Sequence, residues 1–524
     1  MMTPKYKFGF LVLFMVQISL AQFTNIRISP PNLTDPEEVT IAINPLNPAN
    51  LVAGANIAYY FFSTDSGQTW NWGNLTSGYG VWGDPCVRFD ANGHAFFAHL
   101  SYPPSGYWLD RIVVQTSTDG GATWSNGAGV GLNPPKQQDK EWLAIDFTSS
   151  PYHNTIYMSW TEFDNYGSSN PQDSTRILCA HSTDGGVTWS APVRVSDHGG
   201  DCLDSDNTVE GAIPAVGPEG QVYISWSGPL GIMFDRSLDG GATFGQDVFV
   251  TDQPGGWDFP VAGIYRTNGF PTTLCDTSHS PYRGTIYVIW SDQRNGVGNT
   301  DVFLIKSVDG GTTWEGFTRV NGDSTLRDQF FPAATIDPET GILYVVYYDR
   351  ANTTGFATDV TLARSDDGGQ SFTYSTISES AFIPNSSVFF GDYIDIAARN
   401  GRIYPIWMRM DMGDRSVWTA LVHDEWLTVS EPAANAPVDF QLMPNFPNPF
   451  NGTTRIQYTL SRRQYVRLAV YDVNGKLLRV LEEGTRDAGN HMVQFQAGGI
   501  AAGVYFCSLT AGGYQQVRKM VYLP

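Results

Sequence analysis

The densest group of oxygen-bearing side chains lies in the segment from His198 to Asn207. Within it, Asp201, Asp204 and Asp206 offer carboxylate oxygens, which are the ligands that calcium prefers. The spacing of these three aspartates differs from that of an EF-hand loop. The sequence therefore leaves two interpretations open for this segment, a calcium site or a solvated turn.

A second group consists of arginines that stand one or two residues from an aspartate. The pairs are Asp292 with Arg294, Asp349 with Arg350, and Asp411 with Arg409. A guanidinium can bind a carboxylate through two parallel N–H donors, so the three arginines could hold an acidic substrate. The alternative is that each arginine forms a local ion pair with the aspartate beside it.

These side chains are embedded in a repeated sequence pattern, Ser-x-Asp-x-Gly-x-Thr-Trp. Full copies start at Ser63, Ser117, Ser182 and Ser307, and relaxed copies start at Ser237 and Ser365. The Ser and Asp side chains can bond the backbone of a turn, and the Gly permits a positive φ, so each copy predicts a hairpin turn. The aspartates of the six copies are Asp65, Asp119, Asp184, Asp239, Asp309 and Asp367.

Successive copies begin 54 to 70 residues apart, which leaves room for about four short strands and their loops. A β-branched and aromatic run precedes each copy, and a seventh such run, Ile403 to Trp407, follows the last one. Repeated four-stranded meanders indicate an all-β chain folded as a β-propeller. Seven runs favour seven blades, with the turn pattern missing from the last, while the six turn patterns leave six blades open.

Acidic residues precede the first strand of every predicted blade. They are Glu37, Glu38, Asp84, Asp139, Glu141, Glu210, Asp258, Asp328 and Asp392. If the repeated turns join third and fourth strands, these acids lie on the opposite face, where the Asp–Arg pairs also leave the second strands. Acids and arginines are therefore expected to converge on one face, where the acids could cap strands, bind a hard cation or act on a substrate.

The repeated turns match the Asp-box, or BNR, repeat, and residues 22–428 resemble the sialidase-like propeller superfamily. In that superfamily the Asp boxes are structural turns on the face opposite the active site. The resemblance implies a glycan site in which three arginines hold the substrate carboxylate, an aspartate serves as acid and base, and a Tyr–Glu pair supplies the nucleophile. One departure is that Asn25-Ile26-Arg27-Ile28-Ser29-Pro30 lacks the aromatic and the adjacent proline of the family's Phe/Tyr-Arg-Ile-Pro motif.

The resemblance can be carried onto individual residues of this sequence. It implies a substrate clamp made of Arg294, Arg350 and Arg409. It implies that Glu210 or Asp258 is the acid/base, with Tyr347 or Tyr348 nearby. Glu141, Asp292 and Asp349 complete the predicted substrate-binding set. Paired carboxyl groups suit the cleavage of a glycosidic bond.

The N-terminus has the form of a secretory signal peptide. Lys5 and Lys7 precede an apolar run from Phe8 to Leu20, which is too short to span a membrane, and small residues precede a cleavage site after Ala21. Residues 1–21 are therefore predicted to be removed, and the mature chain to carry no transmembrane segment. In an oxidising compartment the five cysteines leave at least one unpaired. Cys202 and Cys275, in comparable loops between blades, are the predicted disulfide.

The C-terminal part differs in composition and in sequence signature. Residues 429–440 have linker composition, and residues 441–524 show alternating strands and Asn-Gly turns typical of a small Ig-like β-sandwich. This segment resembles the C-terminal sorting domain of the type IX secretion system. The match rests on Pro-Asn-Pro-Phe-Asn from 447, Val-Tyr-Asp from 470, Gly-Val-Tyr-Phe from 503 and Lys-Met-Val from 519. It implies export by a Gram-negative bacterium, followed by release or anchoring at the cell surface.

Charge is divided unevenly along the chain. The formal net charge of -21 has three parts. Residues 1–21 carry +2 from Lys5 and Lys7, residues 22–439 carry -28 from 20 basic and 48 acidic residues, and residues 440–524 carry +5 from nine basic and four acidic residues. An acidic surplus of this size makes nucleic acid a poor partner. The change of sign agrees with two domains that have different partners.

Two functions from different classes follow from these observations. The first is a secreted, sialidase-like propeller that binds or hydrolyses an extracellular glycan or glycoprotein, with exo-sialidase activity if it is an enzyme. The second is a non-catalytic propeller that serves as a surface adhesion or interaction scaffold. No cofactor beyond calcium is expected, because the sequence shows no zinc-type Cys/His spacing, no Gly-rich phosphate loop and no Gly-x-Ser-x-Gly motif.

Overall fold

A computed structural model describes residues 23–411, 413–427, 440–443, 445–460, 462–472, 476–511 and 514–523. The chain divides into two compact units between Asp424 and Glu425. The predicted signal peptide and nearly all of the predicted linker, up to residue 439, lie outside the described residues. Within the described part, no helix has the length and apolar character needed to cross a membrane.

The described residues of the first unit form seven four-stranded antiparallel sheets. The first three are β2 (Thr40–Ile43), β3 (Leu51–Ala55), β4 (Tyr59–Ser63) and β5 (Asn71–Asn74); β6 (Cys86–Phe89), β7 (Ala95–Leu100), β8 (Ile112–Ser117) and β9 (Ala128–Val130); and β10 (Gln137–Ile145), β11 (Ile156–Phe163), β12 (Thr175–Ser182) and β13 (Val193–Arg194). The next three are β14 (Glu210–Val216), β15 (Val222–Ser227), β16 (Ile232–Ser237) and β17 (Val248–Thr251); β20 (Thr272–Cys275), β21 (Ile286–Asp292), β22 (Asp301–Ser307) and β23 (Glu315–Arg319); and β24 (Gln329–Ile336), β25 (Leu343–Asp349), β26 (Asp359–Ser365) and β27 (Thr373–Thr376).

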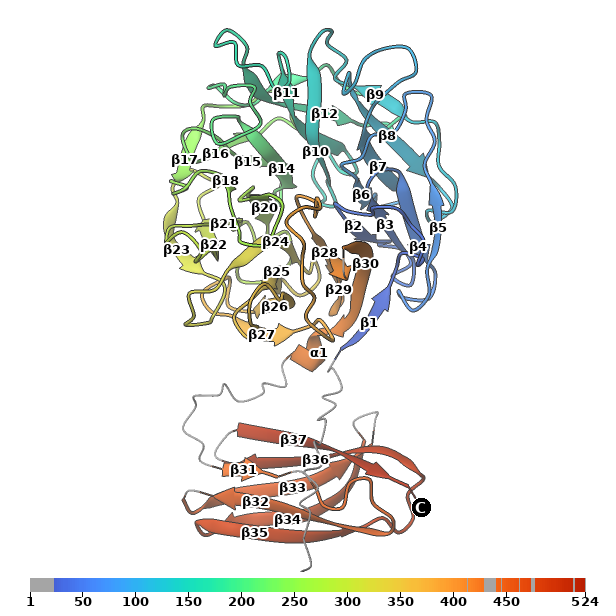
Figure 1. The fold of residues 1–524 in the computed structure, drawn as a ribbon, viewed down its shortest axis with the longest axis vertical. Helices are drawn as coiled ribbons and strands as arrows, with labels where there is room; N and C mark the ends of the chain where they lie inside the picture. The colour runs from blue at the N-terminus through green and yellow to red at the C-terminus, as the bar shows by residue number, and fades with distance from the viewer. Residues whose placement is uncertain are drawn as a thin grey trace, which may run out of the picture. The chain divides into compact units, whose positions relative to one another are not determined.

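Figure 1 shows these sheets arranged in a ring, with the first strand of each sheet innermost. The second strands carry the β-branched and aromatic runs and are buried along their length, as in β11 and β25. From the first sheet to the sixth, apolar clusters pack each sheet against the next, as in a propeller that buries both faces of its blades. The predicted all-β propeller of four-stranded meanders is confirmed.

The seventh sheet is closed by the N-terminal strand. It contains β28 (Asp395–Arg399), β29 (Arg402–Asp411), β30 (Asp414–His423) and, outermost, β1 (Thr24–Arg27). β1 pairs antiparallel with β30, so Thr24 lies opposite Leu421 and Arg27 opposite Trp418. The Ile28 N–H extends this pairing by donating to the Val417 carbonyl at 2.8 Å. A short helix, α1 (Asp424–Leu427), follows β30.

The repeated sequence pattern forms the turns between third and fourth strands. In the second copy, the Ser117 hydroxyl and the Thr123 N–H donate to one Asp119 carboxylate oxygen at 2.8 and 2.9 Å, and the Thr123 hydroxyl donates to the other at 2.6 Å. The Gly121 N–H donates to the Ser117 hydroxyl at 2.9 Å, and Gly121 has a φ of 94°. The bonds of Asp65, Asp184, Asp239, Asp309 and Asp367 repeat this arrangement.

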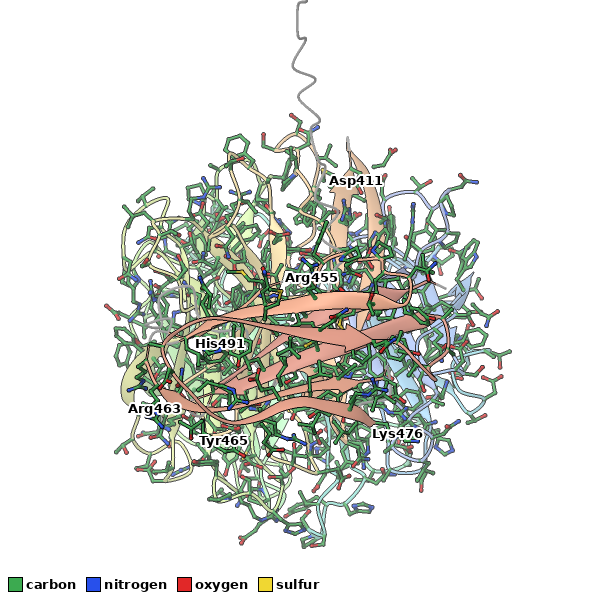
Figure 2. All side chains as sticks on the ribbon, turned by 90° about the horizontal axis from the view of Figure 1, so that it is seen from below. Asp411, Arg455, Arg463, Tyr465, Lys476 and His491 are labelled. Atoms are coloured by element: carbon green, nitrogen blue, oxygen red, sulfur yellow. The ribbon has the colours of Figure 1, made fainter. Side chains whose placement is uncertain are left out.

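The second unit is a β-sandwich, as predicted. One sheet contains β31 (Phe440–Leu442), β32 (Thr453–Leu460) and β35 (Gly489–Gln496), and the other contains β33 (Gln464–Tyr471), β34 (Leu477–Arg486), β36 (Gly503–Ala511) and β37 (Tyr514–Tyr522). The sheets share one apolar core that includes Ile456, Leu468 and Leu509. Figure 2 shows Arg463 and Tyr465 near one end of this unit and Lys476 near the other.

Candidate functional site

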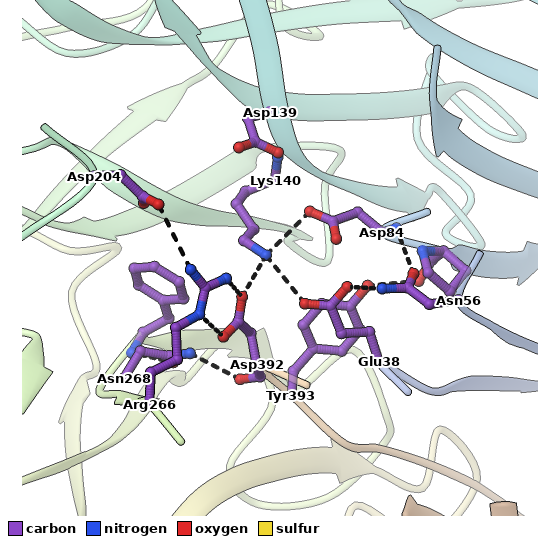
Figure 3. A network of polar contacts seen from close by, with 12 residues as sticks. Glu38, Asn56, Asp84, Asp139, Lys140, Asp204, Arg266, Asn268, Asp392 and Tyr393 are labelled. Atoms are coloured by element: carbon purple, nitrogen blue, oxygen red, sulfur yellow. Dashed lines mark hydrogen bonds and ion pairs between the residues drawn. The ribbon is translucent and has the colours of Figure 1, made fainter. Parts of the chain in front are cut away.

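A buried lysine gathers acids from several sheets at one end of the propeller channel. The Nζ of Lys140 lies 2.7 Å from an Asp392 oxygen, 3.1 Å from an Asp84 oxygen and 3.3 Å from a Glu38 oxygen. These residues precede or begin the first strands of the third, seventh, second and first sheets, and only 7% of the Lys140 side chain is exposed. Figure 3 shows the four side chains converging from different strands. We call this group, together with Arg266 and Asp204, the mouth network.

The backbone turns sharply where the mouth network is built. Glu38, Asp84 and Lys140 all have a positive φ, between 52° and 53°, which is uncommon for residues other than glycine. In β10 this coincides with a register shift between Asp139 and Trp142. Such a bulge re-aims a side chain that regular strand alternation would place elsewhere. The strained backbone therefore directs Lys140 toward the acids of the neighbouring sheets.

A second cation reaches the network from a segment inserted between β17 and β20. This segment carries a small separate sheet of β18 (Asp258–Phe259) and β19 (Thr267–Asn268). The Arg266 guanidinium donates to both carboxylate oxygens of Asp392, with Nε 2.8 Å from the nearer one, and lies 3.6 Å from Asp204. The Asn268 amide donates to the Asp392 carbonyl at 2.8 Å. Because 41% of the Arg266 side chain is exposed, this part of the network faces solvent.

The two cations and the acids fix one another's protonation states. Burial alone would favour the neutral form of Asp392, but the Lys140 and Arg266 cations outweigh it and hold the Asp392 pKa well below its usual range. Burial likewise disfavours the charged form of Lys140. The attraction of its acidic neighbours, Asp392, Asp84 and Glu38, outweighs this effect, so the Lys140 pKa is raised. Both groups are therefore ionised at neutral pH.

Other acids at the same place are held in the opposite state. Glu210 is fully buried, and no donor among the described residues reaches either of its oxygens. Burial, followed by the charges of Asp204 and Asp139, raises the Glu210 pKa well above its usual range, and the group within hydrogen-bonding reach is the Asp204 carboxyl. Burial and the nearby Asp84 charge also raise the Glu141 pKa, and neither oxygen of Glu141 has a donor.

Below the network, the innermost strands enclose a cavity of about 530 Å³. Lys140, Asp392 and Tyr393 line it together with apolar side chains such as Trp142 and Ile394. The mouth network thus forms part of the wall of the channel.

The arginines predicted as a substrate clamp each bind other groups of the protein. Arg294 forms a two-pronged pair with Asp292, at 2.6 to 3.0 Å, and packs against Phe317. The buried Arg350 donates to the Thr358 hydroxyl at 3.1 Å and to the Ala262 carbonyl at 2.6 Å. Among the described residues, no recorded contact joins any two of Arg294, Arg350 and Arg409.

Arg409 pairs with Asp411 at 2.8 Å and with the Ser380 carbonyl at 2.9 Å. Asp349, which follows Tyr348 in β25, accepts hydrogen bonds from Gln329 and Thr361 instead of from the adjacent arginine. Tyr347 and Tyr348 are buried in β25, where the Tyr348 hydroxyl donates to the Met408 carbonyl at 2.8 Å. Neither tyrosine contacts the mouth network.

The two residues predicted as alternatives for the acid/base both adjoin the acidic segment 198–207. Glu210 begins β14 and adjoins Asp204, and Asp258 in the inserted segment donates its N–H to Asp206 at 2.8 Å. Burial, then the charges of Asp206 and Asp204, raise the Asp258 pKa. The candidates Glu210 and Asp258 therefore share one rim with the acidic segment 198–207.

The three aspartates predicted as calcium ligands have separate partners. Asp201 accepts from the Thr208 hydroxyl at 2.9 Å, Asp204 from the Tyr166 hydroxyl at 2.7 Å, and Asp206 from the Asp258 N–H. Among the residues that the structure describes, no three His, Cys, Asp or Glu side chains are grouped so that they could hold a metal ion.

The predicted disulfide between Cys202 and Cys275 is wrong, because all five cysteines are free thiols. Cys202 is buried in the acidic segment, whereas Cys275 packs against the apolar cluster of the fourth and fifth sheets. The prediction was based on the similar positions of the two cysteines in the repeat. Equivalent loops of different sheets do not lie within the distance that a disulfide requires.

Sequence reasoning missed the two cations of the mouth network. The signal for Lys140 was that it stands between Asp139 and Glu141, just before the apolar residues of the same strand. A lysine in a buried strand needs acidic partners, so this position could have been predicted to form ion pairs. The signal for Arg266 was the longest spacing between repeats, 70 residues from Ser237 to Ser307, which leaves room for the inserted segment.

Comparison with known proteins identifies the second unit. Residues 445–522 match the model of the secretion system C-terminal sorting domain, so the predicted sorting domain is confirmed. A search of curated proteins finds no match to the chain.

Solved structures similar to the chain include propellers that act on glycans. An ulvan lyase of a polysaccharide lyase family is 12% identical, with a TM-score of 0.46, and the alignment covers 76% of this chain and 96% of that one. NanB sialidase from Streptococcus pneumoniae is 9% identical, with a TM-score of 0.44 and coverage of 72% and 84%. An α-L-arabinofuranosidase from Fusarium graminearum is 12% identical, with a TM-score of 0.43 and coverage of 66% and 93%. Likeness at this level says nothing about the substrate of this chain.

Proposed function

We propose that this protein is exported by the type IX secretion machinery of a Gram-negative bacterium and acts on a glycan outside the cell. The sorting domain at residues 445–522 supports the export. The propeller is the functional unit, and its site is the rim of the channel around Glu210, Asp204 and Asp258.

One observation carries the proposal for this rim. Glu210 is a buried carboxyl whose pKa is raised well above its usual range, first by burial and then by the charges of Asp204 and Asp139, which favours its protonated form, and the Asp204 side chain beside it is 21% exposed. A protonated carboxyl can donate to the oxygen of a glycosidic bond while a second carboxyl assists the attacking water or stabilises the positive sugar ring. Glu210 is therefore the proposed proton donor, and Asp204 or Asp258 is the proposed second carboxyl.

The charges at the rim favour a neutral glycan over a sialoside. The solvent-facing cation there, Arg266, is already paired with Asp392 and Asp204. Arg294 and Arg409 are paired with Asp292 and Asp411, and Arg350 is buried, where it donates to Thr358 and Ala262. An acidic sugar would also have to approach the -28 charge of residues 22–439.

Glycosidase assays of the mature protein test the proposal. Methylumbelliferyl glycosides of neutral sugars and a sialoside are supplied as substrates, and Glu210→Gln is compared with wild type. Loss of a general acid lowers kcat/KM about 100-fold or more. The matched control is Glu219→Gln, an exposed glutamate between β14 and β15. Turnover of no glycoside, or equal turnover by Glu210→Gln and wild type, contradicts the proposal.

The scaffold alternative is favoured by a different observation. Lys140 binds Glu38, Asp84 and Asp392, which come from three different sheets. Such a contact would also be expected if the charged groups served only to hold the sheets together. If so, the protein binds its partner without turnover, and Glu210→Gln leaves binding unchanged.

A further inference from the structure

Two exposed aromatic side chains lie beside the mouth network. The segment between β5 and β6 carries Trp82, which is 39% exposed, and the segment between β7 and β8 carries Tyr102, which is 50% exposed. Their rings meet edge to face, with centroids 5.1 Å apart. Both segments lie at the ends of the strands opposite the repeated turns, on the face that carries the mouth network.

The backbone holds this pair rigidly. The Trp82 N–H donates to the Leu100 carbonyl and the Leu100 N–H donates to the Gly83 carbonyl, both at 3.0 Å, and the Tyr102 N–H donates to the Tyr79 carbonyl at 3.1 Å. Gly80 has a φ of 72°, and a Cβ there would overlap the Tyr102 carbonyl. These hydrogen bonds fix the two segments to each other, so little conformational entropy is lost when a ligand contacts the rings.

The same backbone connects the aromatic pair to the acids. Trp82 stands two residues before Asp84, whose carboxylate binds Lys140. The Asp84 N–H donates to the Asn56 side-chain oxygen at 2.8 Å, and the Asn56 amide donates to Glu38. A Cβ on Gly83, which has a φ of 100°, would overlap this asparagine, so the turn between Trp82 and Asp84 requires glycine.

We propose that Trp82 and Tyr102 form a subsite for a sugar ring of a neutral polysaccharide, continuous with the channel mouth. The negative face of an aromatic ring attracts the polarised C–H groups on the flat side of a pyranose. Asp204 at the mouth, whose side chain is 21% exposed, can accept a hydrogen bond from a sugar hydroxyl. The solvent exposure of two adjacent aromatic rings on rigid loops has no explanation in the packing of the propeller. This subsite rests on the proposed glycan function and specifies the part of the surface that binds the chain.

Affinity electrophoresis of the full mature chain in gels containing xylan, galactomannan, xyloglucan or laminarin tests the subsite. At least one polysaccharide retards the wild type, and Trp82→Ala and Tyr102→Ala each weaken its affinity about tenfold, which corresponds to 1.4 kcal/mol. Trp82→Phe keeps a stacking face and retains most of the affinity. The matched control is Trp72→Ala, because Trp72 is 46% exposed but stands on the outermost strand β5.

The outcomes separate the subsite from the proposed chemistry. Retardation that depends on Trp82 but not on Glu210 supports the subsite, whether or not a glycoside is cleaved. Cleavage that depends on Glu210, with Trp82→Ala bound as tightly as wild type, overturns the subsite and leaves the proposed acid in place. Wild type retarded by none of the four polysaccharides, or Trp72→Ala weakened as much as Trp82→Ala, also overturns it. Thermal unfolding of every variant confirms that the propeller is folded.

Discussion

Lys140 is the side chain on which the charge balance of the channel mouth depends. It is almost fully buried and contacts the carboxyl groups of Asp392, Asp84 and Glu38, which come from other sheets. Breaking a buried ion pair by removing one partner leaves the other charge without compensation, and that costs more than the pair itself contributes. The stability of the propeller should therefore be sensitive to this one side chain.

Replacing Lys140 by Met is expected to lower the free energy of unfolding by about 3–5 kcal/mol at neutral pH, because Asp392, Asp84 and Glu38 lose their shared cation. Urea unfolding of the mature protein measures the loss. Lys136→Met is the control, since Lys136 pairs with Glu162 and Asp164 but its side chain is 29% exposed, and its removal should cost about 1 kcal/mol or less. Equal losses in the two variants would show that Lys140 contributes no more than a surface lysine.

Glu37 gives a prediction about pH. Burial raises its pKa from 4.5 to about 8, although the Arg415 cation acts in the opposite direction. Between about pH 4.5 and 8 the folded state therefore keeps a proton that the unfolded state has released, so the free energy of unfolding falls as pH rises through this window. Glu37→Gln should remove up to about 1.4 kcal/mol per pH unit of this slope. Urea unfolding at pH 5, 6, 7 and 8 measures it, with the exposed Glu219→Gln as control.

The acids of the candidate site could be predicted from the sequence, and their partners could not. Six of the seven first strands begin near a carboxylate, and the repeat period places those positions at one end of a ring. The exception is β20, because Asp258, the acid predicted for it, lies in the inserted β18. Lys140 contacts Asp392 across 252 residues of sequence, and no local pattern encodes such a pair. The arginines beside Asp292 and Asp411 were visible, but sequence spacing cannot say whether a guanidinium faces its neighbour or a ligand.

The repeated turn is the element that defines the propeller. Its Asp accepts three hydrogen bonds from the Ser and Thr of the same eight residues, as at Asp119. Because these bonds are local, the turn could be read from sequence alone. The inserted segment with β18 and β19 could not, because it occurs once and its short strands lack a periodic pattern.

Asp119→Ala is expected to cost about 1 kcal/mol, the usual effect of removing a side chain that caps exposed backbone N–H groups. Burial slightly opposes ionisation of Asp119, but the Thr123 hydrogen bonds outweigh it and lower its pKa. The contribution is therefore present above about pH 4 and is lost as pH falls through the folded-state pKa. Thermal unfolding at pH 7 and pH 3 tests both parts, and the exposed Asp414→Ala is the control. Glycan binding should be unchanged in Asp119→Ala, since this turn lies on the face opposite the mouth network.

At the scale of the whole molecule, the first unit is a ring fastened by its own N-terminus. The sequence predicted the run Ile403 to Trp407 in the last sheet and left its outer strand unassigned. That strand is β1, whose residues pair with β30 almost 400 positions away. A four-residue strand with mixed exposure carries no signal that would identify so distant a partner.

Ile28 tests this fastening. Ile28→Ala removes a buried side chain and is expected to cost about 2–4 kcal/mol. Ile28→Pro also removes the N–H that donates to the Val417 carbonyl, which should add about 1–3 kcal/mol. Urea unfolding of the two variants gives the difference. If both lose the same stability, the hydrogen bond beyond β1 does not help to hold the ring closed.

The pairing of β1 with β30 also sets an order of events during synthesis. Thr24 leaves the ribosome long before Leu421, its partner, and at about 5–20 residues per second the delay is roughly 20 to 80 seconds. Six sheets can form from neighbouring hairpins, but the ring stays open until the last hairpin meets the strand that was made first. Closure is thus a late step with a high loop-closure entropy, and an unpaired β30 edge is exposed until it occurs.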